Sequence, residues 1–231
     1  MFNINNNQQI NFPFDKFIYE VSNKFSSKII KDYIFNWNRY FDIFESVFEI
    51  EYNEFFKRYF PFEQNNKRYE YFQFTQHFDE VNSFYIYNFD IEELKIRTKK
   101  LKSQRMSTKK LEKISHYYFY SNIPKLKINN PIILYPFYLG NKNFLIIDGN
   151  HRFSYRLNNN KLFTKAIFLD SANVSDFIFS IDWAMFMFVR EINKFLSNSI
   201  IEDIEVYINK SGFLKSSYFR NVVDYVNMKN K

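Results

Sequence analysis

The stretch Phe144–Arg152 places the strongest constraint on what this chain can fold into. Its first four residues, Phe144 to Ile147, are all apolar, which is typical of a short buried strand. Asp148 and Gly149 then interrupt the apolar run, and glycine permits a backbone conformation that other residues resist. The next segment, Asn150 to Leu157, predicts a short helix because its apolar residues recur four positions apart. The sequence therefore predicts a strand, a tight polar turn and a helix.

The predicted turn has the chemistry of an anion site. The first amides of a helix lack partners within the helix, and the helix dipole favours negative charge there. His151 and Arg152 add side-chain donors that suit phosphate oxygens. A purely structural interpretation stands beside this one, with Asp148 capping the corner and Arg152 lying on the surface.

A resemblance to a known family favours the anion site. The segment IIDGNHRFSYRL, from Ile146 to Leu157, resembles the phosphate-binding motif of the ParB/sulfiredoxin-like superfamily. In that superfamily a strand is followed by a turn of the type D-G-x-H-R or G-x-x-R and then by a helix. The similarity in element order extends over Tyr85 to Asp170, and Tyr85–Asp90 resembles the first strand of the superfamily's core. Ser107 is the expected N-cap of a following helix, and Leu162–Leu169 is the strand expected after the motif helix. The resemblance implies a nucleotide-binding protein, since members bind and hydrolyse CTP, reduce sulfinic acids with ATP or phosphorylate free serine.

The resemblance also implies roles for individual residues. Nucleotide phosphates would be bound by the turn and by Arg105, which resembles the arginine of the superfamily's first motif; the turn residues are Asp148, Gly149, Asn150, His151 and Arg152. The expected ligand is a nucleoside triphosphate with magnesium. An enzyme would also need a general base or a metal carboxylate. The catalytic candidates are Glu92, Glu93 and His151, with Glu112 as a further acid.

A second family motif is less consistent with the sequence. Fic AMP-transferases carry H-P-F-x-[DE]-G-N-G-R, which can be aligned on Asp148, Gly149 and Asn150. In that alignment Phe144 stands at the position of the catalytic histidine, and His151 stands at the position of a glycine. The chain would therefore lack the base of a Fic enzyme.

Charge is concentrated in one segment of the chain. Lys95 to Lys113 holds nine basic residues and a single acid, Glu112, so it carries a charge of +8. Subtracting this from the total of +7 leaves about −1 for the rest of the chain. The segment predicts a basic patch, which either is a solvated surface or binds nucleic acid. A cysteine count of zero excludes disulfides and the thiol chemistry of sulfiredoxin itself.

Helical patterns flank the central region on both sides. Apolar residues recur three or four apart from Ser26 to Phe60, which predicts one long helix ending at Pro61, or two helices joined near Asn36–Asn38. The wide apolar face could pack on the chain itself or on a second copy in a homodimer. Helices are also expected from Ser175 to Leu196 and, with Ser199 as N-cap, through Ile208.

These patterns together predict an α+β fold, in which a small mixed sheet of ParB/sulfiredoxin-like type is flanked by N-terminal and C-terminal helices. The expected regions are 1–80, mainly helical and rich in aromatic residues, 81–171, the core, and 172–231, helical. The N-terminus lacks a basic-then-apolar signal. The longest apolar run, Trp183–Val189, is far shorter than the roughly 18–20 residues that span a bilayer. We therefore expect a cytoplasmic protein without a membrane partner.

The sequence is compatible with three functions. The first is a nucleotide-binding protein that acts as a hydrolase or phosphotransferase. The second is a nucleic-acid-binding module that uses the basic segment 95–113. The third is a non-catalytic accessory protein of a mobile element. The intact D-G-N-H-R sequence favours the first function over the third, and no convincing helix-turn-helix follows the motif, which argues against chromosome partition.

Overall fold

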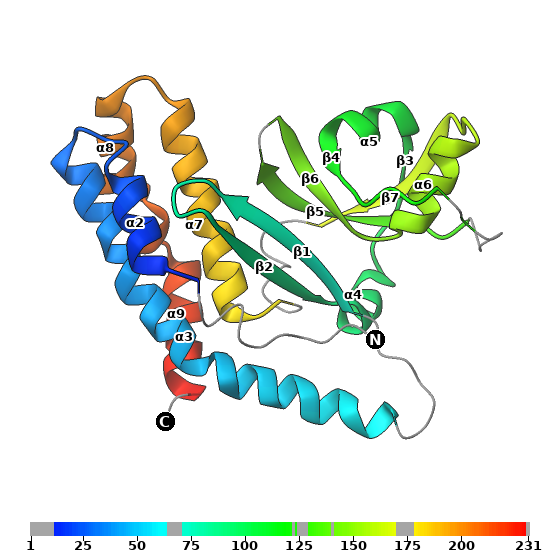
Figure 1. The fold of residues 1–231 in the computed structure, drawn as a ribbon, viewed down its shortest axis with the longest axis horizontal. Helices are drawn as coiled ribbons and strands as arrows, with labels where there is room; N and C mark the ends of the chain where they lie inside the picture. Colours follow the sequence, from blue (N-terminus) through cyan, green and yellow to red (C-terminus); the bar gives the residue numbers. More distant parts are fainter. Residues whose placement is uncertain are drawn as a thin grey trace. The chain divides into compact units, whose positions relative to one another are not determined.

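The computed structural model describes residues 12–63, 71–121, 123, 129–139, 141–169 and 178–229. Figure 1 shows the fold, which divides into two compact units. The first unit comprises residues 1–68, 73–88 and 179–231, and the second comprises 69–72 and 89–178. The expected regions 1–80 and 172–231 thus largely belong to one unit, and the second unit begins its main segment at residue 89 rather than 81.

The first unit is mainly helical. Its elements are α2 (Phe14–Ser22), α3 (Lys28–Glu63), α7 (Ser180–Ser197), α8 (Ile201–Ser211), the short 3-10 helix η1 (Phe213–Lys215) and α9 (Ser217–Lys229). Helix α3 is a single helix through Asn36–Asn38, and it ends two residues after Pro61, where the sequence predicted its end. Proline removes a backbone donor, and the helix stops within a turn of it.

Two other helix starts differ from the sequence prediction. Helix α7 begins at Ser180, and the predicted start at Ser175 lies outside the described residues. Helix α8 has Ile200, not Ser199, at its N-cap position, without a side-chain cap. The Asn198 side chain instead accepts a hydrogen bond from the Ile200 amide at 3.1 Å. An Asn side chain can bond the backbone two residues further on, so the turn before α8 is made by Asn198.

Aromatic side chains fill the core of the first unit. Trp37 of α3 stacks on Phe213 with ring centroids 5.9 Å apart, and Phe188 of α7 meets Phe41 edge to face at 5.7 Å. The buried carboxylate of Glu191 accepts hydrogen bonds from the Tyr33 and Tyr207 hydroxyls at 2.8 and 2.9 Å. Many of the chain's abundant aromatic residues are thus core residues that join α3, α7, α8 and η1.

Strands β1 (Tyr71–Phe78) and β2 (Ser83–Asp90) form a two-stranded sheet of their own. The resemblance predicted Tyr85–Asp90 as the first strand of the core sheet, and that prediction is wrong. The alternation along β2 buries Tyr85, Tyr87 and Phe89 on one face. Within the first unit this face is fixed to α7, because Asp182 accepts bonds from the Tyr85 hydroxyl and the Asn88 amide at 2.9 Å each.

The second unit is built on a five-stranded mixed sheet with strand order β3-β7-β5-β6-β4. The strands are β3 (Gln104–Ser107), β4 (Ser115–His116), β5 (Ile132–Leu139), β6 (Lys142–Asp148) and β7 (Phe163–Phe168). The helices are α4 (Ile91–Thr98), α5 (Thr108–Ile114) and α6 (Asn150–Asn158). Strand β7 is antiparallel to β3 and parallel to β5, whereas β6 is antiparallel to β5 and parallel to β4. The sheet confirms the predicted α+β class.

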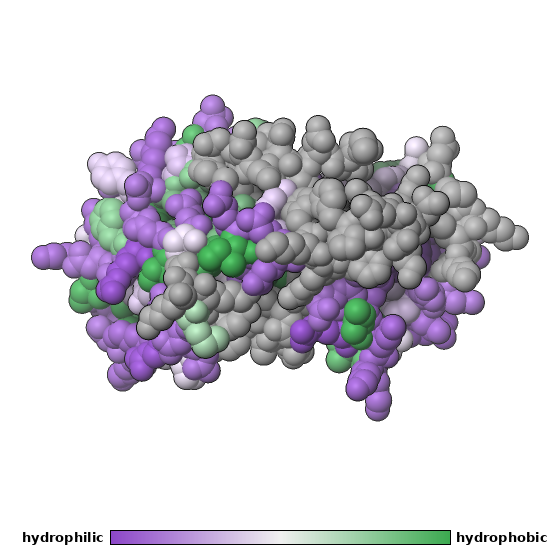
Figure 2. Space-filling view, turned by 90° about the horizontal axis from the view of Figure 1, so that it is seen from below, coloured by the Kyte–Doolittle hydropathy of each residue, from purple (hydrophilic) through white to green (hydrophobic). Residues whose placement is uncertain are grey.

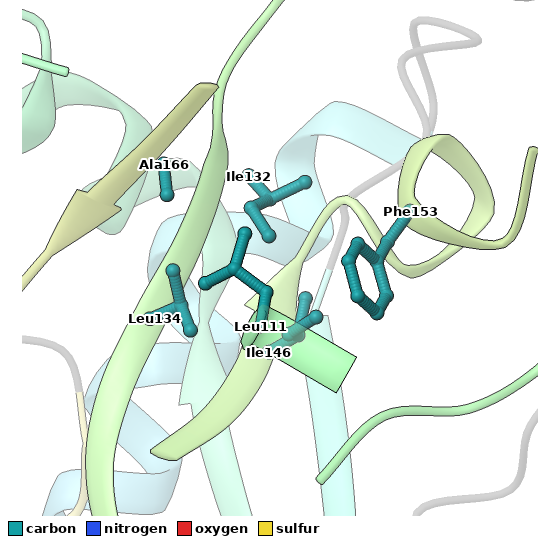
Figure 3. Packing of buried hydrophobic residues seen from close by; sticks show 6 residues of the cluster. All are labelled: Leu111, Ile132, Leu134, Ile146, Phe153 and Ala166. Atoms are coloured by element: carbon teal, nitrogen blue, oxygen red, sulfur yellow. The ribbon is translucent and has the colours of Figure 1, made fainter. Parts of the chain in front are cut away.

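Helices α5 and α6 pack on one face of this sheet. Leu111 of α5 and Phe153 of α6 are completely buried there, against strand residues that include Ile132, Leu134 and Ile146 (Figure 3). Ser107 caps α5 as the sequence predicted, since its side chain accepts from the Lys110 amide at 3.4 Å. The strand–turn–helix expected around Phe144–Arg152 is therefore confirmed as β6, the turn and α6.

The surface that Figure 2 shows is mainly hydrophilic where it is described. On the face shown in Figure 2, exposed hydrophobic residues occur in small separate groups among polar ones. Among the described residues, no helix combines the length and apolar character needed to cross a bilayer.

The buried Asp182 carboxyl predicts how the stability of the first unit depends on pH. Burial raises its pKa to about 7, although the hydrogen bonds from Asn88 and Tyr85 act in the opposite direction. Folded Asp182 thus keeps a proton that the unfolded chain releases near pH 4. Its contribution to the free energy of unfolding should therefore fall as the pH rises from about 4 to about 7, and stay constant above that. Urea unfolding of wild type and Asp182→Asn across this range isolates the contribution.

The difference in unfolding free energy between Asp182→Asn and wild type should increase through this range and then level off. Tyr85→Phe removes a hydrogen bond that lowers the Asp182 pKa. The pKa of the folded protein should therefore rise, and the decrease in stability should extend to higher pH. A difference that is the same at every pH would contradict the assignment.

Candidate functional site

The turn between β6 and α6 requires glycine for two reasons. Gly149 has φ +96°, in the left-handed region that favours glycine. A Cβ atom at this position would also lie 2.8 Å from Ile132 Cγ2 and 2.9 Å from Arg152 Nη2. Gly149 occupies the N-cap position of α6, and no side chain caps the helix. The amides of its first turn therefore have no capping side chain among the described residues.

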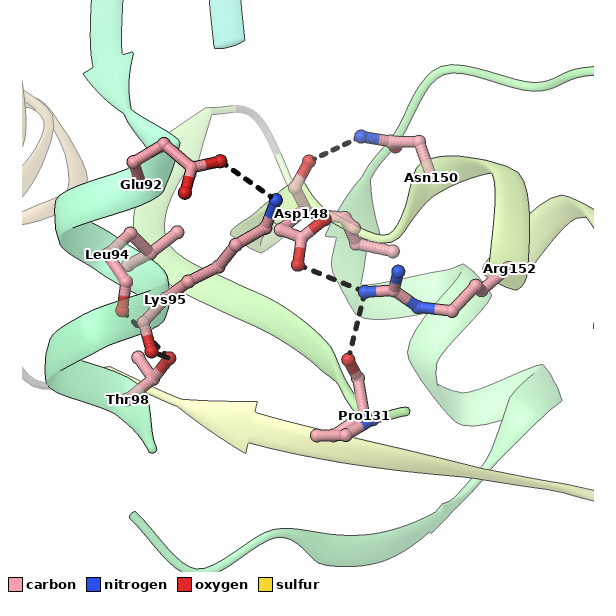
Figure 4. Close-up of polar contacts among 9 residues, drawn as sticks. Glu92, Leu94, Lys95, Thr98, Pro131, Asp148, Asn150 and Arg152 are labelled. Atoms are coloured by element: carbon pink, nitrogen blue, oxygen red, sulfur yellow. Dashed lines mark hydrogen bonds and ion pairs between the residues drawn. The ribbon is translucent and has the colours of Figure 1, made fainter. Parts of the chain in front are cut away.

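Arg152 folds back over this turn (Figure 4). Its Nη2 atom donates to the Asp148 carboxylate at 3.0 Å and to the Pro131 carbonyl at 3.1 Å. The Asp148 and Arg152 side chains are 14% and 19% exposed, so water screens this ion pair only in part. The pair connects the end of β6, the chain before β5 and the first turn of α6.

The purely structural alternative expected Arg152 on the surface, and the structure corrects this. Both of its hydrogen bonds use Nη2, whereas a guanidinium carries five N–H donors. The Nε atom is buried and has no hydrogen-bond partner among the described residues. A buried donor without a partner costs about 1–3 kcal/mol. Arg152 therefore supports the corner and still has donor capacity next to the α6 N-terminus.

The Asn150 side chain is used inside the protein. Its Nδ2 donates to the Ile146 carbonyl at 2.8 Å, and its Oδ1 accepts from the Tyr118 amide at 2.9 Å. Asn150 was expected to bind phosphate through the turn, but its side chain is buried in these contacts. What Asn150 offers to a ligand is its backbone N–H.

Asn150 is the first of three polar residues, spaced four apart on α6, that bind the extended segment after β4. One turn further along the helix, Ser154 Oγ accepts from the Tyr120 amide at 3.1 Å. In the next turn, Asn158 Nδ2 donates to the Tyr120 and Ser121 carbonyls at 3.4 Å. The sequence analysis missed this role, although polar residues at i, i+4 and i+8 on a helix with a buried apolar face were a visible signal.

His151 points away from the core. Its ring is exposed and stacks on the Tyr120 ring, with centroids 3.8 Å apart and an interplanar angle of 24°. The segment that α6 holds through Ser154 thus sets the orientation of His151. Together they place an aromatic pair beside the helix N-terminus.

Arg105 lies elsewhere in the second unit. Its guanidinium is 4.1 Å from the centroid of the Phe163 ring, on the paired strands β3 and β7. Arg156 donates to the Phe163 carbonyl at 3.0 Å, and burial, followed by the charge of Arg152, lowers its pKa. In the described part of the chain Arg105 makes no hydrogen bond or ion pair with the turn. The predicted convergence of Arg105 and Arg152 on one phosphate is therefore not visible in the structure.

The acidic catalytic candidates form ion pairs on α4. Glu92 lies 3.4 Å from Lys95 Nζ, and Glu93 lies 2.6 Å from Arg97 Nε. Glu112 is exposed on α5. Within the described ranges, no three His, Asp or Glu side chains are grouped as a metal site would require. His151 is the catalytic candidate that lies at the turn itself.

The α6 contacts predict a local change on substitution. Ser154→Ala removes the acceptor of the Tyr120 amide, and Asn150→Ala removes that of Tyr118. Each should lower the free energy of unfolding by about 0.5–1.5 kcal/mol, the net contribution of a typical hydrogen bond, because these bonds are only partly buried. Hydrogen exchange at the Tyr118 and Tyr120 amides should become faster in both variants.

Asn159→Ala is a suitable control, since its exposed side chain bonds the carbonyl of Tyr155 in the same helix and no other described residue. It should change stability by less than about 0.5 kcal/mol. Unchanged exchange at Tyr118 and Tyr120 in Ser154→Ala would show that this side chain does not hold the segment.

Comparison with known proteins adds no relative to this description. No protein-family model matches the chain, and neither curated proteins nor solved structures give a match. The family resemblance accordingly rests on the D-G-N-H-R turn and on the order of strands and helices around it.

Proposed function

We propose that this chain binds the phosphate groups of a nucleotide at the turn Asp148–Arg152, on a core of ParB/sulfiredoxin-like type. One observation carries the proposal. The buried Nε of Arg152 lacks a partner among the described residues, and this donor lies on a side chain that folds over an uncapped helix N-terminus. A phosphate oxygen would satisfy both the guanidinium and the first amides of α6.

The Asp148–Arg152 pair supports binding rather than preventing it. Asp148 holds Nη2 and so fixes the plane of the guanidinium. A planar, preorganised fork loses less side-chain entropy when it binds an oxyanion than a mobile side chain does. Arg156, one turn along α6, adds positive charge close to Arg152. The helix dipole and two arginines outweigh the single carboxylate of Asp148.

His151 and Tyr120 supply the next groups that a nucleotide would meet. The exposed imidazole lies one residue from Arg152 and can donate to a phosphate oxygen or transfer a proton. This position makes His151 the candidate general base for the hydrolase or phosphotransferase activity that the resemblance implies. A nucleoside triphosphate would carry magnesium on its own phosphates, since such sites use few protein carboxylates.

Isothermal titration with nucleoside triphosphates and magnesium tests this proposal. Wild type should bind a triphosphate more tightly than the corresponding nucleoside. Arg152→Lys keeps the charge beside Asp148 and removes the Nε donor. Affinity should fall about 10- to 150-fold, the equivalent of roughly 1.5–3 kcal/mol for bonds to a charged group.

Arg156→Lys is the matched control, because it makes the same change one turn along the same helix and should leave nucleotide affinity within about twofold, near the error of such energies. Melting temperatures of both variants report whether they fold. The proposal fails if no nucleotide binds, or if Arg152→Lys and His151→Ala both bind triphosphate as tightly as wild type does.

A further inference from the structure

The edge of the five-stranded sheet carries a second cationic surface. Strand β3 is the edge strand and pairs with β7, so that Arg105 lies directly opposite Lys165 and Ser107 lies opposite Phe163. Opposite residues of an antiparallel pair project from the same face of the sheet. All four side chains are exposed, whereas Thr164 and Ala166, which alternate with them, are buried. Arg105, Lys165 and Phe163 therefore form one outward surface, here called the β3–β7 surface.

Most basic residues of 95–113 have no carboxylate partner in the described part of the chain. Of the basic residues in 95–113, Lys95 and Arg97 pair with Glu92 and Glu93 on α4. The other lysines are exposed and form no ion pair with any described residue; they are Lys99, Lys100, Lys102, Lys109, Lys110 and Lys113. Lys165 also lacks such a partner and lies directly opposite Arg105. Like charges at opposite positions destabilise a sheet, so this arrangement is a cost that an anionic ligand would offset.

Exposed apolar groups lie between these charges. Phe163 is 43% exposed and Leu162 is 77% exposed. The Arg105 guanidinium lies over one face of the Phe163 ring, 4.1 Å from its centroid, and Arg156 holds the Phe163 carbonyl at 3.0 Å. The ring is thus fixed at its backbone and on one face, beside Arg105 and Lys165.

We infer that the β3–β7 surface binds single-stranded nucleic acid, with a base against Phe163 and phosphates on Arg105 and Lys165. Single-strand binders combine a cationic track with aromatic side chains on which bases stack. Charge complementarity alone would suit any polyanion. The fixed, exposed aromatic ring favours unstacked bases over a duplex, whose bases are stacked inside, and over an acidic peptide, which has no aromatic faces to offer.

Charged residues on an edge strand can also serve to prevent aggregation. That role accounts for Arg105 on β3, but it does not account for Lys165 and the exposed Phe163 on the second strand. The inference is separate from the nucleotide proposal, since its ligand would contact Arg105, Lys165 and Phe163 and none of the turn residues 148–152. Arg152→Lys should leave single-strand binding unchanged, so either proposal can fail without the other.

Fluorescence anisotropy with a labelled oligothymidylate of about 12 nucleotides, within the range of known single-strand sites, measures the interaction. Wild-type affinity should fall steeply as salt rises, because phosphate contacts release counterions. Phe163→Ala should weaken binding roughly 5- to 150-fold, the fold-change expected for loss of one stacked base. Phe163→Trp should retain binding, and its indole fluorescence should be quenched by the oligonucleotide.

Charge variants separate this surface from general electrostatics. Arg105→Gln with Lys165→Gln should reduce the salt slope by about 1.4, since each single-strand phosphate contributes about 0.7. Lys210→Gln, which removes one exposed charge on α8, should have no measurable effect. The inference is wrong if a hairpin duplex or anionic vesicles bind as tightly as the single strand. It is also wrong if folded Phe163→Ala binds like wild type, or if no binding occurs at about 50 mM salt, where phosphate contacts are strong.

Discussion

The second unit depends on the left-handed backbone at Gly149. This conformation ends β6 and starts α6 without an intervening loop, and it leaves no room for a Cβ between Ile132 and Arg152. The Arg152 guanidinium occupies that space and connects Asp148 with the Pro131 carbonyl. One backbone conformation therefore determines how three chain segments meet. The helix that it starts has no side-chain cap, so the same constraint serves packing and the anion binding that we propose.

Polar contacts position α6 as much as apolar ones do. A nine-residue helix has little stability in isolation, and most of its stabilisation must come from tertiary contacts. Phe153 fixes one face of α6 to the sheet, while Asn150, Ser154 and Asn158 bind a second segment on another face. Because that segment carries Tyr120, these bonds also orient the ring that stacks on His151. The surroundings of the turn are in this way built by residues that would not touch a ligand.

Local patterns in the sequence predicted β6, α6, β7 and α5 well, because each has a short-range cause. An apolar run, a glycine, a serine cap and a spacing of four residues act within the segment itself. The position of β2 was predicted wrongly, since its alternating face is equally compatible with any apolar surface. What fixes β2 to α7 is Asp182, a carboxylate nearly a hundred residues away that accepts hydrogen bonds from Tyr85 and Asn88 of β2. No local pattern contains that information.

The same limit applies to charge. The sequence predicted one basic segment, 95–113, as a single patch. In the folded chain, Lys95 and Arg97 are neutralised on α4 by carboxylates of their own helix, whereas Arg105 is joined across the sheet by Lys165, a residue outside the segment. Basic residues within one short segment thus have different electrostatic environments. Lys165, about fifty residues further along the chain, belongs to the same surface as Arg105. The number of charges in the segment does not show which side chains lie together. That is determined by the register of β3 and β7, which places Arg105 and Phe163 on the same face of the sheet.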